Sequence, residues 1–191
     1  MNSDEVLSIL EETGALLKGH FELRSGLHSD LYFQCANVLR YPRLAARLCA
    51  ALVDRVREAA PEVVKVDAVM SPALGGIIVG HEIARVLAVR SLFAEKADGK
   101  LVLRRFAVER GERFLVAEDV VTRGGRVQET VELVERAGGR VTGIAVLVDR
   151  SGGKAQFAHP FFSLLELAPV TWEPGDCPLC REGVPPVHPG S

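Results

Sequence analysis

The feature that most restricts the fold of this chain is the segment of residues 113–127, RFLVAEDVVTRGGRV. Its apolar run at residues 114–117 predicts a buried strand, and the apolar spacing after residue 126 predicts a helix. Two acids, a threonine and two glycines lie between them and predict a tight turn. A strand, a glycine-containing turn and a helix in direct succession are the building unit of a parallel sheet.

The same unit recurs along much of the chain. Further strands are expected at residues 66–70, 89–93, 141–148 and 161–167, and helices at residues 42–60, 77–89 and 126–137. The run VTGIAVLV is nearly all apolar, as in a strand that is buried on both faces. This alternation predicts an α/β fold, a parallel twisted sheet flanked by helices, with binding residues at the carboxyl ends of the strands.

The central segment combines two chemical characters. Glu118 and Asp119 follow its strand and offer hydrogen-bond acceptors to a neutral polyol. The turn after Thr122 offers backbone N–H groups at the positive end of a helix dipole, which suit a phosphate. A ligand that uses both is a sugar phosphate. Neither GxxxxGK nor GxGxxG follows a predicted strand, so a P-loop or a dinucleotide site is not expected.

Three parts of the chain can be distinguished. The α/β core is expected at residues 41–168, between an N-terminal hood of residues 1–40 and a Pro- and Gly-rich tail of residues 169–191 that lies along the surface. Within the hood, residues 21–38 mix alternation with a Ser-Gly turn, which indicates a surface hairpin or a lid over a planar ligand. A helix before them is expected to be capped by Ser3 or Asp4, with an apolar face that includes Leu16 and Leu17 and is interrupted near Gly14.

A charged turn, EKADGK at residues 95–100, precedes a strand that is predicted at residues 101–108. The turn and the predicted strand together carry four cations within ten residues, Lys96, Lys100, Arg104 and Arg105. The segment is either a solvated hairpin or a mobile flap that carries cations over an anionic ligand.

Composition excludes several classes of protein. A net charge of −2 does not favour nucleic-acid binding, and no apolar run is long enough to span a membrane. The acidic, amphipathic N-terminus resembles neither a secretory signal nor a transit peptide. We therefore expect a cytoplasmic protein that binds neither nucleic acid nor membranes.

The four cysteines do not form a disulfide scaffold, because Cys35 and Cys49 stand alone. Cys177 and Cys180 have the spacing of half a zinc site, for which His188 or a partner chain could supply further ligands. We expect them instead to be two reduced or loosely paired thiols.

The sequence LVAEDVVTRGG resembles the phosphoribosyl-pyrophosphate signature of the type I phosphoribosyltransferases. Within that family the chain is most similar to the orotate phosphoribosyltransferases. The similarity extends to GHFELRSGLHSDLYF in the hood, SPALGG after the first core strand and VLVDRSGG late in the chain. Together these motifs cover most of residues 14–153.

The resemblance implies that Glu118 and Asp119 bind the ribose 2′- and 3′-hydroxyls and that residues 122–126 hold the 5′-phosphate. The turn of residues 71–76 corresponds to the pyrophosphate loop, where a strained peptide is expected at Ala73–Leu74. The implied phosphoribosyl-pyrophosphate site consists of Glu118, Asp119, Val120, Val121, Thr122, Arg123, Gly124, Gly125, Arg126, Ser71, Pro72, Ala73, Leu74, Gly75, Lys96 and Lys100.

For orotate the resemblance implies Arg24, Tyr32, Phe33, Thr122 and Arg150. Arg150 matches the arginine that binds the orotate carboxylate, and the aromatic pair lies against the pyrimidine. Arg24 stands where a lysine is usual, and the two side chains are not equivalent donors. The implied catalytic residues are Asp119, Glu118 and Lys96.

The implied reaction is displacement of pyrophosphate at C1′ by a nitrogen of orotate, through an oxocarbenium-like transition state. It yields orotidine 5′-phosphate for pyrimidine biosynthesis. Mg²⁺ is the implied cofactor; it bridges pyrophosphate and ribose hydroxyls without a direct protein ligand. A homodimer is also implied, in which the flap serves the neighbouring site.

The flap departs from the family pattern. Glu95 stands where an arginine is expected, Lys100 aligns only approximately with a family cation, and the segment contains no histidine. Two other functions therefore stay open, transfer to another base such as a purine, and regulation without catalysis by a protein that binds phosphoribosyl pyrophosphate. The aromatic pair and Arg150 favour an anionic pyrimidine, and no basic helix-turn-helix segment precedes the core.

Overall fold

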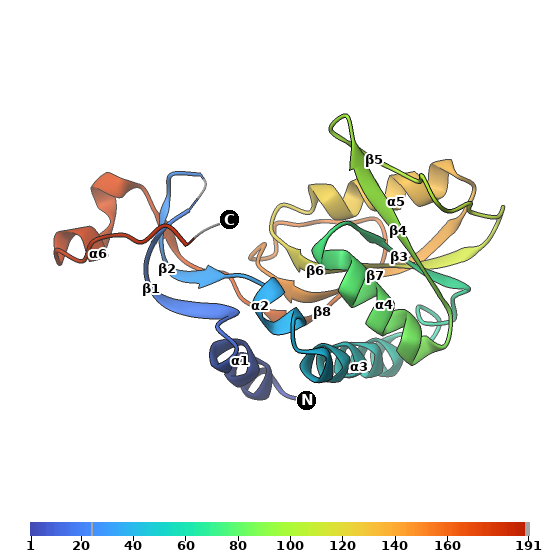
Figure 1. The fold of residues 1–191 in the computed structure, drawn as a ribbon, viewed down its shortest axis with the longest axis horizontal. Helices are drawn as coiled ribbons and strands as arrows, with labels where there is room; N and C mark the ends of the chain where they lie inside the picture. Colours follow the sequence, from blue (N-terminus) through green and yellow to red (C-terminus); the bar gives the residue numbers. More distant parts are fainter. Residues whose placement is uncertain (24, 190–191) are drawn as a thin grey trace.

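A computed structural model describes residues 1–23 and 25–189 of the chain. Its main part is a six-stranded sheet in the order β5-β4-β3-β6-β7-β8, and a smaller three-stranded sheet has the order β1-β2-β9 (Figure 1). In the main sheet every neighbouring pair is parallel except β4 with β5. The predicted α/β architecture is confirmed.

The core elements follow the predicted order. Its strands are β3 (Ala68–Pro72), β4 (Arg90–Ala97), β5 (Lys100–Val102), β6 (Arg113–Val121), β7 (Arg140–Asp149) and β8 (Phe161–Glu166), and its helices are α3 (Pro42–Ala59), α4 (Gly75–Leu87) and α5 (Gly125–Arg136). The strand expected at residues 101–108 is wrong beyond Val102, where the chain leaves the sheet.

The helices cover both faces of the main sheet, α3 and α4 one face and α5 the other (Figure 1). Along β6, Leu115 and Ala117 belong to the hydrophobic cluster that includes α3 and α4, whereas Val116 belongs to the cluster that includes α5. This alternation is the two-residue period of a strand. Burial on both faces explains why the central strands are continuously apolar in the sequence.

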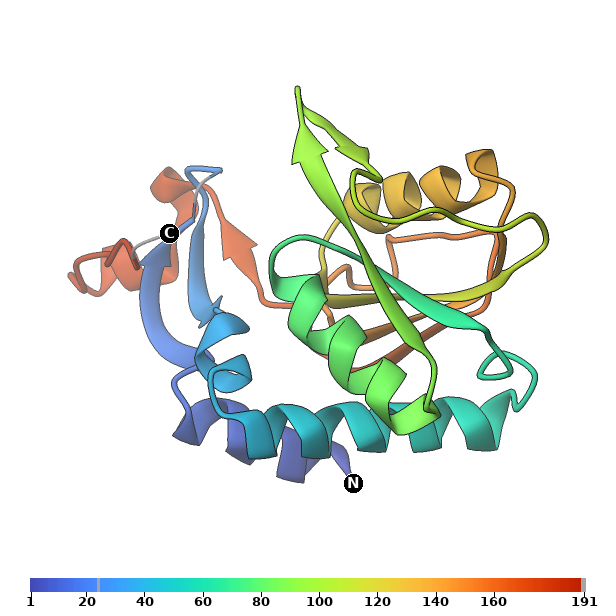
Figure 2. The same cartoon turned by 45° about the vertical axis from the view of Figure 1, so that its right-hand side comes forward.

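The hood contains α1 (Ser3–Glu12), β1 (Leu16–Glu22), β2 (His28–Phe33) and α2 (Ala36–Leu39). The tail contains β9 (Thr171–Trp172), a short 3₁₀ helix (Pro174–Asp176) and α6 (Pro178–Arg181). Because β9 pairs with β2, the tail lies beside the hood, as both views show (Figures 1 and 2).

Two details of the first helix correct the sequence expectations. Its N-cap is Asn2, whose Oδ1 accepts a hydrogen bond from the Glu5 backbone N at 2.9 Å, so neither Ser3 nor Asp4 is the cap. Leu16 and Leu17 lie in β1 instead of continuing the helix. The reason is Gly14, whose φ of 68° turns the chain directly after the helix.

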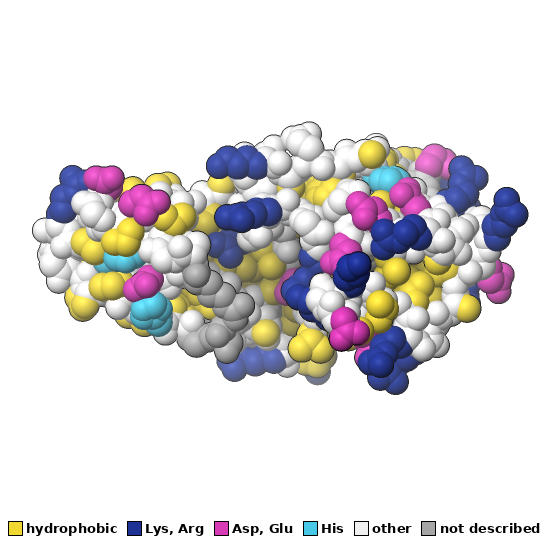
Figure 3. All heavy atoms as spheres, turned by 90° about the horizontal axis from the view of Figure 1, so that it is seen from above, with side chains coloured by type: hydrophobic (Ala, Val, Ile, Leu, Met, Phe, Trp, Pro, Cys, Tyr) yellow, Lys and Arg dark blue, Asp and Glu magenta, His cyan; other side chains and the backbone are white. Residues whose placement is uncertain are grey.

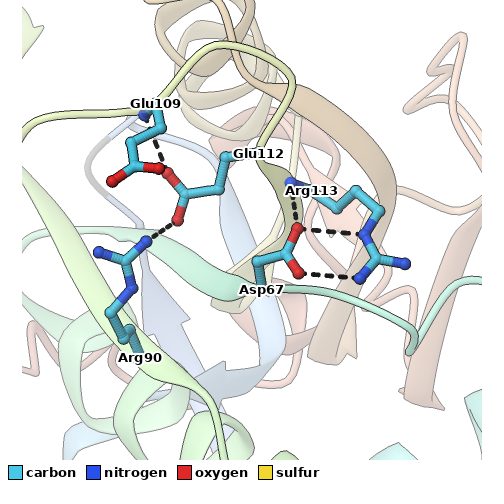
Figure 4. A network of polar contacts seen from close by, with 5 residues as sticks. All are labelled: Asp67, Arg90, Glu109, Glu112 and Arg113. Carbon is cyan, nitrogen blue, oxygen red and sulfur yellow. Dashed lines mark hydrogen bonds and ion pairs between the residues drawn. The ribbon is translucent and has the colours of Figure 1, made fainter.

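Ion pairs join the strands at the amino edge of the main sheet (Figure 4). Arg113, at the start of β6, binds both carboxylate oxygens of Asp67 at 2.8 and 3.1 Å, and this pairing lowers the pKa of Asp67 to about 2. Arg90, at the start of β4, pairs with Glu112, which also accepts a hydrogen bond from the Glu109 backbone N at 3.0 Å. These ion pairs lie at the edge of the sheet opposite to the one that carries Glu118 and Asp119.

Candidate active site

A pocket of about 700 Å³ opens at the carboxyl end of β6. Its walls are Leu23, Ser25, Tyr32, Glu118, Asp119, Val120, Val121, Thr122, Arg123, Gly124, Gly125, Arg126, Val127 and Arg150. The structure thus brings the acidic pair, the loop after β6, one hood aromatic and Arg150 together. Seen from above, Lys and Arg side chains lie on both sides of the hollowed middle of the molecule (Figure 3).

The loop between β6 and α5 has the geometry of an anion site. Gly124 adopts a φ of 79°, and a Cβ at this position would lie 2.9 Å from the Phe157 ring, so the turn requires glycine. Helix α5 begins at Gly125 without a side-chain cap. Within the described chain, no side chain accepts a hydrogen bond from the backbone N–H groups of residues 122–126. Free N–H groups at a helix N-terminus bind phosphate.

The two carboxylates lie beside this loop, at the end of the strand. Glu118 is only 2% exposed, and its Oε1 accepts a hydrogen bond from the Asp119 backbone N at 3.1 Å. Asp119 Oδ1 accepts one from the Val120 backbone N at 2.8 Å. The start of α4 lies against both acids, because a Cβ at Gly75 would collide with the Asp119 carboxylate and one at Gly76 would lie 2.8 Å from Glu118 Oε1.

The surroundings of Glu118 keep its side chain protonated. Burial is the main cause, and the neighbouring charge of Asp119 adds to it, so that the pKa of Glu118 is raised to about 9. These surroundings favour the neutral carboxyl of Glu118 over the carboxylate in the ligand-free protein.

This raised pKa predicts how stability depends on pH. Between the ordinary value of 4.5 and about 9, the folded protein holds a proton on Glu118 that the unfolded chain has lost. The contribution of Glu118 to the free energy of unfolding therefore falls as the pH rises through this window. We expect Glu118→Gln, which keeps the neutral form, to remove that contribution, so that the variant gains stability relative to the wild type as the pH rises.

Urea unfolding of both ligand-free proteins at several pH values between 5 and 9 would measure the difference. Other titrating groups cancel in the comparison because they are common to the two proteins. Parallel pH profiles would contradict the raised pKa.

Arg150 directly follows the end of β7 and lines the same pocket as the two acids. Its Nε is buried without a hydrogen-bond partner among the described residues, and burial lowers the pKa of the guanidinium group. The guanidinium carbon lies 5.8 Å from the centroid of the Phe33 ring. A half-buried arginine on the wall of a pocket, with an Nε that lacks a hydrogen-bond partner, is a ready donor for a carboxylate. Phe33 supports Arg150 and is not part of the pocket wall, whereas Tyr32 is.

None of residues 71–76, the loop expected to hold pyrophosphate, lines this pocket, and this includes Gly75. Ser71 and Pro72 are buried in β3, and the Ser71 hydroxyl donates to the Leu92 carbonyl at 3.5 Å. Their side chains do not line the pocket, nor do Ala73 and Leu74. The Ala73–Leu74 peptide, where an unusual bond was expected, is cis, and the Leu74 side chain is 80% exposed.

The expected flap is a hairpin formed by β4 and β5, which projects from the main sheet (Figures 1 and 2). Neither Lys96 nor Lys100 lines the pocket of its own chain. Glu95 binds Arg105 through two hydrogen bonds of 3.0 and 3.2 Å, so this cation of the segment is paired with an acid of the hairpin. Arg24 lies outside the described residues.

Sequence reasoning did not identify Leu23, Ser25 or Val127 as pocket residues. Val127 directly follows the predicted loop, and the other two flank Arg24 in the turn of the hood hairpin. Proximity in sequence was their only signal. Among the described residues, no helix has the length and apolar character needed to cross a bilayer.

Solved structures show the same fold. The orotate phosphoribosyltransferase of Mycobacterium tuberculosis H37Rv, determined with inorganic phosphate, matches with a TM-score of 0.67 and 23% identity, over 85% of this chain and 94% of that chain. The adenine phosphoribosyltransferase of Saccharomyces cerevisiae matches with a TM-score of 0.66 and 23% identity, over 83% and 99% of the two chains. Because the enzymes for two bases fit equally well, these likenesses show the fold alone.

The sequence comparison is more specific. The model of the phosphoribosyl transferase domain matches residues 37–179. An orotate phosphoribosyltransferase from Caldicellulosiruptor bescii is 48% identical over 192 aligned residues, which cover 100% of this chain and 98% of the relative. The chain therefore belongs to the phosphoribosyltransferase family, among the orotate phosphoribosyltransferases.

Proposed function

We propose that this protein transfers the phosphoribosyl group of 5-phosphoribosyl 1-pyrophosphate to orotate, with release of pyrophosphate, in pyrimidine biosynthesis. One observation carries the proposal. A single pocket combines an acidic pair and an uncapped amide loop with Arg150, whose buried Nε has no hydrogen-bond partner among the described residues. The acids and the loop suit a ribose phosphate, and the arginine suits the carboxylate of orotate.

We assign each part of the substrates to a part of the pocket. The backbone N–H groups of residues 122–126 bind the 5′-phosphate, and Glu118 and Asp119 bind the ribose hydroxyls. Orotate then lies toward the hood, between Tyr32 and Arg150. Arg150 fixes the carboxylate, so that the attacking nitrogen faces C1′ of the ribose.

The charges of the pocket support displacement through a cationic transition state. Positive charge develops on the ribose ring as pyrophosphate leaves, and Asp119 lies on the wall where the ribose hydroxyls bind. A fixed negative charge there stabilises the transition state more than the ground state. Orotate is acidic enough to attack without a strong general base.

The donor set also fits Mg²⁺. The acidic side chains of Glu118 and Asp119 both line the pocket, and they would hold the ion through the bound substrate instead of ligating it directly. The ion would neutralise the charge of the pyrophosphate leaving group.

The test is an assay of the purified protein with phosphoribosyl pyrophosphate, Mg²⁺ and one base at a time. We expect orotate to be consumed and orotidine 5′-phosphate to appear, whereas uracil, adenine and xanthine remain unchanged. Consumption of a purine base without consumption of orotate would overturn the proposed substrate. Binding of phosphoribosyl pyrophosphate without any transfer would favour the regulator.

We further propose that the protein is a homodimer in which the β4–β5 hairpin of one subunit serves the pocket of the other. The support is that Lys96 and Lys100 lie outside the pocket of their own chain on a projecting hairpin. Lys96→Ala is then expected to lower kcat by roughly tenfold or more, because a cation facing pyrophosphate is lost. Lys65→Ala, at an exposed lysine of the core, is the control and should keep the wild-type rate.

Mixing two variants of low activity tests whether the hairpin of one subunit serves the pocket of the other. If Lys96→Ala and Asp119→Asn chains are unfolded and refolded together, half of the dimers contain one chain of each kind. Each mixed dimer has one intact site, so about a quarter of the wild-type activity should return. No recovery, despite mixed dimers, would place Lys96 in the site of its own subunit.

A further inference from the structure

Four metal-binding side chains meet between the hood and the tail. His20 comes from β1, His28 begins β2, Cys177 precedes α6, and Cys180 lies within α6. Their ligand atoms all lie within 4.8 Å of one another. The first three residues are buried, and Cys180 is exposed. The cluster lies outside the pocket described above and has no part in the proposed transfer reaction.

The distances are close to those of a tetrahedral zinc site. Cys177 Sγ lies 3.4 Å and Cys180 Sγ 3.8 Å from His20 Nε2, and Cys180 Sγ lies 3.3 Å from His28 Nδ1. Zinc bonds of about 2.0 Å to nitrogen and about 2.3 Å to sulfur place such ligand pairs about 3.6 Å apart in a tetrahedron. His20 Nε2 and His28 Nδ1 are 2.8 Å apart, and tetrahedral binding of zinc would require about 3.3 Å between them.

The hydrogen bonding of His20 prepares it to bind a metal. Its other ring nitrogen, Nδ1, lies 2.6 Å from the Val184 carbonyl oxygen, which can only accept a hydrogen bond. Nδ1 therefore carries the proton, and Nε2 presents its lone pair to the cluster. A backbone carbonyl that fixes the tautomer of a histidine in this way is typical of metal sites in proteins.

We propose that His20, His28, Cys177 and Cys180 bind one zinc ion. Two thiolates and two imidazoles in a tetrahedral arrangement select zinc over the harder divalent cations. Four protein ligands leave no open position for water or substrate, so the site is structural. His188 is not part of this cluster, and its Nε2 lies 2.8 Å from Glu22 Oε2 instead.

The ion would fasten the tail to the hood. The described contacts between the hood and the tail include the short pairing of β2 with β9 and a few backbone hydrogen bonds. Among these bonds, the Val187 backbone N donates to the His20 carbonyl at 2.8 Å, and the Glu22 backbone N donates to the Val187 carbonyl at 3.1 Å. The three-stranded sheet that zinc would stabilise also contains Tyr32, which lines the pocket of the proposed active site.

The full-length protein, produced in zinc-supplemented medium and passed through a desalting column, should contain about one zinc per chain by elemental analysis. Cys177→Ser and His28→Ala should each lower this content at least tenfold. Cys49→Ala, at a buried cysteine of the core, and His188→Ala are the matched controls and should keep the full content. Retention of zinc by both ligand variants would overturn the proposal.

A spectroscopic measurement on the wild type avoids any question of whether the variants fold. The chelator-treated, reduced protein should bind one equivalent of Co²⁺ and show the strong visible bands of tetrahedral coordination together with a thiolate charge-transfer band. Addition of Zn²⁺ should abolish these bands. Absence of the bands, or two free thiols instead of four in the unreduced, denatured protein, would overturn the proposal, the second result because it indicates a disulfide.

Discussion

Asp119→Asn is expected to lower kcat/KM for orotate by roughly 100-fold or more. The side chain faces the substrate pocket at the end of β6, and its Oδ1 is held by the Val120 backbone N at 2.8 Å. Asparagine has the same shape and can keep that hydrogen bond through its carbonyl oxygen. The substitution therefore removes mainly the negative charge that would face the ribose ring as it becomes cationic.

The comparison of kinetic constants distinguishes this effect from weaker binding. A transition-state role predicts that kcat falls together with kcat/KM, whereas a role in ground-state binding would raise KM alone. Asp54→Asn, on the exposed side of α3, is the control and should leave both constants unchanged. Wild-type activity of Asp119→Asn would remove this residue from the reaction.

The part of the site that could be predicted from the sequence is contiguous in the chain. The strand, the two acids, the turn and the helix occupy residues 113–136, so their order alone determines that Asp119 and the N–H groups of the turn share one edge of the sheet. Gly124 is equally local, because its positive φ is a property of the turn itself. The central strands were recognisable because burial on both faces makes them apolar throughout.

Contacts between distant segments could not be predicted in this way. His20 and Cys177 meet across 157 positions, and the tail sequence has no periodic pattern that would show its pairing with the hood. The support that Phe33 gives to Arg150 likewise joins the hood to the end of β7. The length of the strand predicted at residues 101–108 was overestimated, because the apolar residues after Val102 pack against the core without joining the sheet.

The guanidinium group of Arg150, which lies against the Phe33 ring, is the proposed partner of the orotate carboxylate. Arg150→Ala is expected to raise the KM for orotate roughly 30- to 150-fold, because loss of a buried partner for a carboxylate costs about 2–3 kcal/mol. The KM for phosphoribosyl pyrophosphate should stay within about twofold, since the amide loop and the acids are unchanged. Initial rates with each substrate varied in turn would measure both constants.

Two further variants separate charge from geometry. Arg150→Lys keeps the charge but loses the planar pair of donors and the stacking on Phe33, so its orotate KM should lie between those of the wild type and the alanine variant. Lys154→Ala, at an exposed position in the same loop, should match the wild type. An unchanged orotate KM in Arg150→Ala would mean that the carboxylate binds elsewhere. The proposed orientation of orotate between Tyr32 and the end of β7 would then be wrong.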